Sequence, residues 1–423
     1  MTPAASASDQ RRPYLVVVVL AIFVVIALLT NILGPIIPDI IRSFKLSLTA
    51  AGFLPFAFFI AYGVASIPAG MLVESIGEKR VILAGFGLAL AGALFFALVH
   101  VYAAAIPSLF LIGMGMAMLQ VAINPLLRVA GGSEHFAFNA TLSQLVFGAA
   151  SFLGPLVYSY LVRNLDAGAH DIITGALATV TPPKLAWISV YWVLAVTAAV
   201  MIALLALIHF PRVERQEDEI TGDWQTNRKV FRMPVVLLFF ASTFFYVGAE
   251  QGTADWMSQF LKTYHQFDPE TVGAQAVSWF WGLMTAGCVI GVVLLKIFDS
   301  RKVLIGGSCM TIAAFTVALL SPREVSVIAF PLMGLGASAM WPVIVSLGLN
   351  SVAEHHGTVA GILCTGIAGG AAVPLAIGYL SDHFGLRIGI MLLYVAFGWV
   401  LSIGFWANPI VNNETISSKA KSG

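Results

Sequence analysis

The stretch that decides the fold is LVVVVLAIFVVIALLTNIL, residues 15–33. It carries no charged side chain. Its length is close to the ~20 apolar residues with which a helix crosses a bilayer core. Arg11 and Arg12 precede it, as the charged region of a signal peptide would. The apolar region of a signal peptide is shorter and is followed by a small-residue cleavage site. We therefore interpret residues 15–33 as part of a retained first transmembrane helix.

The rest of the chain has the same apolar character. Of the 423 residues, 59% are hydrophobic and 10% are charged, against about 25% charged residues in soluble domains. Because backbone groups inside a bilayer must bond internally, apolar spans of this length are expected to be helical. The sequence predicts an all-α membrane protein of twelve transmembrane helices, over residues 14–38, 49–73, 80–100, 103–128, 137–163, 186–210, 234–261, 272–296, 302–320, 324–349, 357–381 and 387–408.

Charge divides the chain and orients it. The most polar stretch, 211–232, is predicted to be a cytoplasmic linker between an N-terminal six-helix bundle (1–210) and a C-terminal six-helix bundle with its tail (233–423). If both termini lie inside, the inner segments hold about twice as many lysines and arginines as the outer ones. We expect a multi-pass protein of the cytoplasmic membrane with cytoplasmic termini. The outer loop 164–185 reads either as a small cap or as disordered.

Two charged loops lie six helices apart. Residues 70–80, GMLVESIGEKR, resemble the loop signature of the major facilitator superfamily, with Gly70 for close helix packing and Glu74 and Arg80 as gating charges. Residues 296–302, KIFDSRK, form a degenerate counterpart that contains Asp299 and Arg301. Internal repetition of this kind is typical of alternating-access transporters. The alternative interpretation is ordinary cytoplasmic loop charge.

Uncharged polar and aromatic side chains lie deep in the apolar spans, where polar groups are costly and therefore informative. Amides can both donate and accept hydrogen bonds with sugar hydroxyls, and indole faces suit the C–H faces of a sugar ring. Each residue alone could instead bond a neighbouring helix, but their spread over several helices favours a shared cavity. The predicted substrate-binding residues are Asn31, Gln120, Asn124, Gln144, Glu250, Gln251, Trp281 and Trp341.

Glu250 is the carboxylate that the sequence places near mid-membrane. A lone buried carboxylate favours its neutral form, which makes Glu250 a candidate proton carrier or Na⁺ ligand. The alternative is a neutral Glu250 that bonds a neighbouring helix or the sugar. Asp255, one turn closer to the outside, is compatible with the mouth of the pathway.

Several segments resemble one branch of the major facilitator superfamily, which contains the bacterial L-fucose–proton symporter and the sodium-dependent glucose transporters. The specific ones are LQVAINP (119–125) and MWPVIVSLGL (340–349), supported by YVGAE (246–250). The resemblance implies a twelve-helix fold, a central sugar site and alternating access. Fucose-type members carry acids where this chain has Gly34 and Gln120. Na⁺ coupling, coupling through Glu250 and uniport all remain open.

The function expected from the sequence is secondary transport of a neutral hexose such as glucose or galactose, coupled to Na⁺ or H⁺. An exporter of drugs or lipophilic metabolites is the alternative, disfavoured because an apolar substrate would leave buried amides unpaired. A receptor is a third possibility. We expect no enzyme, because no catalytic spacing or metal cluster is found, and no cofactor besides a co-transported ion. The expected partners are a sugar and the lipid bilayer, without nucleic acid, and the expected state is a monomer.

Overall fold

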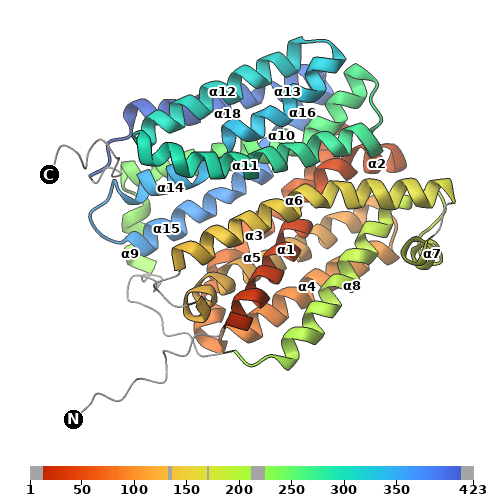
Figure 1. Ribbon diagram of the computed structural model, residues 1–423, viewed down its shortest axis with the longest axis horizontal. Coiled ribbons are helices and arrows are strands. Elements are labelled where there is room, and N and C mark those ends of the chain that lie inside the picture. Colours follow the sequence, from red (N-terminus) through yellow and green to blue (C-terminus); the bar gives the residue numbers. More distant parts are fainter. Residues whose placement is uncertain (1–12, 132–135, 169–170, 211–223, 411–423) are drawn as a thin grey trace.

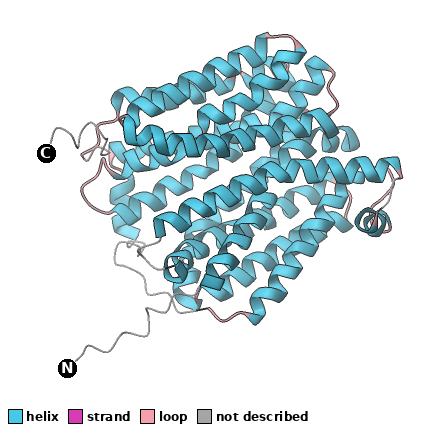
Figure 2. Ribbon diagram, viewed as in Figure 1, coloured by secondary structure: helices cyan, strands magenta, loops and turns pink. Residues whose placement is uncertain are grey.

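A computed structural model describes residues 13–131, 136–168, 171–210 and 224–410 of the protein (Figure 1). Every regular element in these residues is helical (Figure 2). Twelve spans are long and apolar enough to cross a membrane. They are built from α1 (Pro13–Asn31) with α2 (Leu33–Phe44), α3 (Leu48–Ile76), α4 (Glu78–Leu98), α5 (Tyr102–Gly131), α6 (Phe136–Ala167), α8 (Ser189–Leu207), α10 (Pro234–His265), η4 (Pro269–Gly273) with α11 (Ala274–Ile297), α12 (Ser300–Leu320), α13 (Arg323–Ala337) with α14 (Met340–Leu349), α15 (His356–Thr365) with η5 (Gly366–Ala368) and α16 (Gly369–Phe384), and α17 (Leu386–Ile390) with α18 (Leu392–Trp406).

The first span is broken in its middle. Pro35 has no N–H to donate to the carbonyl of Asn31, four residues earlier, and the helix is interrupted between α1 and α2. The predicted span 14–38 is too short, because α2 continues through Pro38 to Phe44. It ends at Lys45, whose left-handed conformation (φ 52°) stops the helix. This extension brings Asp39 into the span, where the sequence analysis had not placed it.

Two short helices lie outside the twelve spans. In the loop 164–185, α7 (Ile172–Ala178) begins with a capping box, so part of that loop is an ordered cap. Hydrogen bonds from the backbone and side chain of Thr174 hold the pKa of Asp171 below its usual value. In the predicted linker 211–232, α9 (Trp224–Phe231) is helical, while 211–223 lies outside the described residues. The linker and domain boundaries stay predictions.

The two halves of the chain, α1–α8 and α10–α18, touch closely at one end. We call this end the far side, and the opposite end, where α1 begins and α18 ends, the terminal side (Figure 1). On the far side, α3 packs along α16: a Cβ on Gly52 would lie 2.9 Å from the Cα of Leu375, and a Cβ on Gly370 would lie 2.9 Å from the ring of Phe59. Only a residue without a side chain permits this approach.

These close contacts stop at mid-helix. Gly63 is the last glycine of α3, moving toward the terminal side, that faces the other half, with a Cβ position 3.5 Å from the Cβ of Ala368. Two turns farther on, a Cβ on Gly70 would meet only Val121 of its own half, at 3.9 Å. A Cβ on Gly361 in α15 would meet no neighbouring atom within 4 Å. The glycine contacts between the halves therefore run from the far side to the middle of α3 and are missing near the terminal side.

Candidate functional site

The predicted polar residues of the first half differ in burial and in hydrogen bonding. Asn31, at the end of α1, donates through Nδ2 to the Oγ of Ser151 on α6 at 2.7 Å, and its Oδ1 is sealed without a partner. Gln120 on α5 is half-buried and Gln144 on α6 is exposed, and neither amide has a hydrogen bond to a residue that the structure describes. The side chain of Asn124 lies outside the described residues. Asn31 thus joins two helices, whereas the amides of Gln120 and Gln144 are free to bind.

Gln144 lies on the face of α6 that meets the second half. Residues four apart on a helix lie on the same face, and Gly148, one turn beyond Gln144, packs against Thr285 of α11. The next turn continues this contact, because a Cβ on Gly282 would lie 2.7 Å from the ring of Phe152. Gln144 therefore faces the second half, one turn beyond the contact on the terminal side.

The predicted residues of α10 are arranged in the same way. Gly34, just after the break in the first span, packs on the backbone of Ala254 and Asp255. Glu250 and Gln251 lie four residues before these two, so they share the same face of α10, one turn closer to the terminal side. Gln251 is buried, yet its amide accepts or donates no hydrogen bond in the described chain. The interrupted helix and these polar groups come together where the halves begin to separate.

Glu250 forms a small cluster with two aromatic residues of the second half. The hydroxyl of Tyr246 donates to its Oε1 at 3.2 Å, and the Tyr246 ring lies 6.1 Å from the half-buried ring of Trp341 on α14. Trp281 on α11 is buried, and its Nε1 has no partner. The cluster offers one carboxylate, one hydroxyl and an indole face, which are groups that suit a polyhydroxylated ring.

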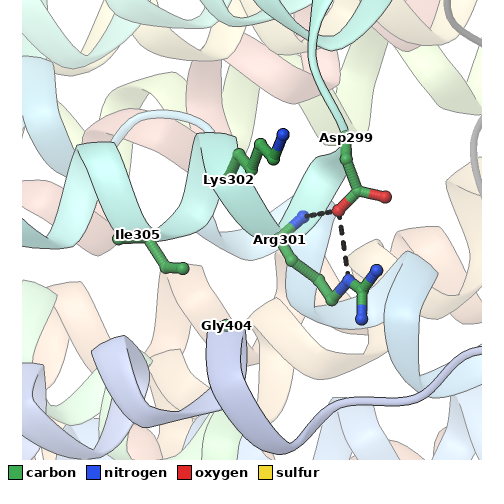
Figure 3. A pocket seen from close by; sticks show the side chains of 5 residues that line it. All are labelled: Asp299, Arg301, Lys302, Ile305 and Gly404. Carbon is green, nitrogen blue, oxygen red and sulfur yellow. Dashed lines mark hydrogen bonds and ion pairs between the residues drawn. The ribbon is translucent and has the colours of Figure 1, made fainter.

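The charged loops of the terminal side have contacts within their own halves. Glu74 and Arg80 are exposed, and the loop is instead anchored by Lys79, whose Nζ donates to the carbonyls of Ala206 and Ile208 at the end of α8, at 2.9 and 2.8 Å. In the second half, Asp299 caps α12 by accepting from the backbone and Nε of Arg301 (Figure 3). The gating roles of these residues stay predictions.

Asp299 and Arg301 also line a pocket of about 390 Å³ between α12 and α18, together with Lys302, Ile305 and Gly404 (Figure 3). Arg301 reaches across toward the carbonyl of Ala407, at 3.4 Å. The pocket is therefore formed within the second half and is separate from the polar residues of α6 and α10.

The sequence analysis missed a polar network on the far side. Asp39 is fully buried, accepts a hydrogen bond from Tyr158, and pairs with Arg42 at 2.8 Å. Arg42 also pairs with Glu270 of the second half at 2.7 Å. The i,i+3 spacing of Asp39 and Arg42 could have predicted their ion pair. The predicted helix ended at residue 38, so neither residue was considered part of it.

A second polar contact closes the same side. Asp382, at the end of α16, accepts hydrogen bonds from the backbone N–H groups of Leu48 and Thr49 at the start of α3, each at 2.8 Å. A carboxylate is favourable at a helix N-terminus because it satisfies unpaired N–H groups and the helix dipole. Both contacts join the first half to the second.

Comparison with known proteins agrees with this architecture. The sequence profile described as Major Facilitator Superfamily matches residues 19–374. The chain belongs to this superfamily. Major facilitator membership confirms the predicted fold class of twelve transmembrane helices, and with it the multi-pass membrane character.

Superfamily members of similar sequence include the glucose/galactose transporter of Brucella abortus, 29% identical over 378 residues, which cover 87% of this chain and 88% of that protein. The L-fucose-proton symporter of Escherichia coli is 26% identical over 402 residues, 89% and 90% of the two chains. Among solved structures, the E. coli fucose:proton symporter aligns with a TM-score of 0.65 (20% identity; 93% and 98% covered). An inward-facing bacterial homolog of the lysosomal transporter Spinster aligns with a TM-score of 0.79 (15% identity; 96% and 98% covered).

Proposed function

We propose that this major facilitator protein is a secondary active transporter of a neutral hexose such as glucose or galactose, and that it works by alternating access as a monomer. The observation that carries the proposal is the set of unpaired amides on faces that turn toward the opposite half, just where the contact between the halves ends. Relatives named for glucose and galactose transport, aligned over most of the chain, support the same substrate class.

Unpaired amides favour a hydroxylated substrate for an energetic reason. A polar group that is removed from water without a partner costs about 1–3 kcal/mol. The amides of Gln144 and Gln251 would incur this cost with an apolar substrate, whereas sugar hydroxyls would satisfy both their donors and their acceptors. Trp341, beside Tyr246, would pack on the apolar face of the ring. Gln120, Asn124 and Trp281 are retained as proposed substrate contacts.

The excess of Lys and Arg in the segments of the terminal side supports a cytoplasmic location of that side. With that orientation, the contact between the halves on the far side closes the outer end, and we infer that the described arrangement faces the cell. We propose a location in the cytoplasmic membrane with both termini inside. In the opposite state, the two charged loops would approach each other and close the inner end. One loop contains Gly70, Glu74 and Arg80, and the other contains Asp299 and Arg301.

Counterflow of labelled hexoses in proteoliposomes tests the proposal, because exchange needs no ion gradient. We expect the wild-type protein to exchange glucose or galactose, and Gln120→Ala to lose exchange while remaining in the membrane. Gln275→Ala is the matched control, since Gln275 is exposed at the far-side start of α11. Unchanged exchange in Gln120→Ala would remove that residue from the site, and absence of exchange with every hexose in the wild type would overturn the function.

A further inference from the structure

Asp255 is a deeply buried acid that the proposed sugar site does not use. It lies about two thirds of the way along α10 toward the far side, and its side chain is only 3% exposed. Its Oδ2 accepts no hydrogen bond, and the structure gives it no ion pair in the described chain. The sequence analysis related Asp255 to the mouth of the pathway, and in the described arrangement the residue is enclosed between helices.

The closed far side is what encloses Asp255. The start of α2 packs directly on α10 there: a Cβ on Gly34 would lie 3.0 Å from the carbonyl carbon of Ala254 and 3.4 Å from the Cα of Asp255. On the next residue of α10, the Nε1 of Trp256 is fixed by the carbonyl of Pro374 on α16, at 3.0 Å. Separation of α2 from α10 would expose Asp255 to the far side.

Among the residues that the structure describes, no charged side chain pairs with Asp255. Charged groups on the elements packed around it have other partners: Arg42 pairs with Asp39 and Glu270, and Asp382 caps α3. On α10 itself, Glu250 lies five residues away and accepts from Tyr246, and Lys262 lies seven residues away. None of these forms an ion pair or a hydrogen bond with Asp255.

An ionised carboxylate without a partner is strongly disfavoured in such a site. The far-side-closed arrangement therefore requires Asp255 in its neutral, protonated form. Building on the proposed transport function, we propose that Asp255 is the proton-coupling residue, and that closure of the far side over it carries one proton from that side into the membrane. A metal cation is disfavoured as the ligand because hard cations gather several oxygen atoms.

The proposed cycle balances the proton. When the far side is open, the Asp255 carboxylate takes a proton from the far-side solution, and the neutral acid permits closure. Once the terminal side is open, the proton leaves toward the cytoplasm. The remaining charge, enclosed and unpaired, destabilises the closed far side and returns the carrier to the open state. Low pH should consequently favour the closed far side, and high pH should favour the open far side.

Cysteine labelling tests this linkage without any sugar. Ile36 on α2 is fully buried beneath the closed far side, and Ile36→Cys can be placed in a background where Cys288, Cys309 and Cys364 are serine. We expect its labelling by a membrane-impermeant maleimide from the far side to rise about tenfold between about pH 6 and pH 8, normalised to unfolded protein at the same pH. In Asp255→Asn, labelling should stay low and change less than about twofold.

Controls make each result decisive. Asp166→Asn removes an exposed far-side acid and should keep the wild-type pH dependence. A pH-independent wild type, or an Asp255→Asn variant that keeps the dependence, would overturn the proposal, and a pH-independent wild type does so even if the variant fails to fold. In vesicles, Asp255→Asn should retain hexose counterflow and lose accumulation driven by a proton gradient. Accumulation in the wild type driven by Na⁺ alone would also overturn the proton-coupling proposal. Absence of hexose counterflow alone would overturn only the hexose assignment.

Discussion

Residues of the same chemical type have different tasks in this protein. Asn31 is bonded to Ser151 across two helices, whereas Gln144 has no hydrogen bond to any described residue. An interhelical hydrogen bond within a membrane contributes about 0.6 kcal/mol on average. A free amide contributes nothing to the fold and remains available for a substrate.

This difference predicts opposite effects of two substitutions. Asn31→Ala should lower the free energy of unfolding by about 0.5–1.5 kcal/mol, with most of the loss coupled to Ser151 in a double-mutant cycle with Ser151→Ala. Gln144→Ala should leave stability unchanged and reduce hexose exchange. Thermal unfolding in detergent measures the first effect. Equal stability losses in the two variants would contradict the assignment.

Sequence reasoning is better suited to contacts within one helix than to the polar contacts that close the far side. Tyr246 and Glu250 lie four residues apart in the sequence, and the structure joins them by a hydrogen bond. The i,i+4 rule suffices for such pairs because one helix carries both residues. The partnership of Arg42 with Glu270 spans 228 positions, and no local pattern predicts which half-buried charges meet across two bundles.

At the scale of elements, the far side is closed by contacts of unequal strength. Arg42 is 56% exposed, so its pair with Glu270 is screened by solvent and contributes about 0–1 kcal/mol. The contact of Asp382 with the start of α3 is a charge-assisted bond to two N–H groups, which is the stronger type. The balance between open and closed states can therefore be shifted by small changes.

Arg42→Ala should shift the population toward an open far side by up to about fivefold, the ratio that about 1 kcal/mol supplies. Distances between spin labels at Lys45 and Gln275, measured by pulsed electron resonance, should show a larger long-distance component. Arg323→Ala is the control, because its partner Glu324 lies beside it in the same half. Arg42→Lys, which keeps a cation beside Asp39 and Glu270, should retain most of the wild-type distribution, and an unchanged distribution in Arg42→Ala would exclude a role for this pair.

At the scale of the whole molecule, the twelve-helix fold was predictable because apolar length alone identifies a membrane span. The interruptions within the spans were less accessible. Pro35 marks the break after α1, but Pro38, three residues on, lies inside a helix that continues. A proline sets where a backbone bond is lost, whereas the packing around it decides whether the helix ends there.

Closure of the far side depends on glycines, and this predicts a locked state. Gly52→Val would place its Cβ 2.9 Å from the Cα of Leu375, so α3 and α16 could not approach. We expect the variant to reach the membrane, to show an open far side by the same spin-label distances, and to lose exchange. Gly87→Val is the matched control, since Gly87 has nothing within 4 Å. Normal exchange in Gly52→Val would show that the two helices need not touch.

The contact of Gly63 with Ala368, midway along α3, has a mechanical consequence. If the halves rock as rigid bodies, atoms at this height act as a fulcrum: they travel least, while the two ends of α3 swing in opposite directions like the arms of a lever. A solute held level with this pivot stays in place as the walls tilt around it. The protein can thus transfer a solute from one solution to the other with little displacement of the solute itself.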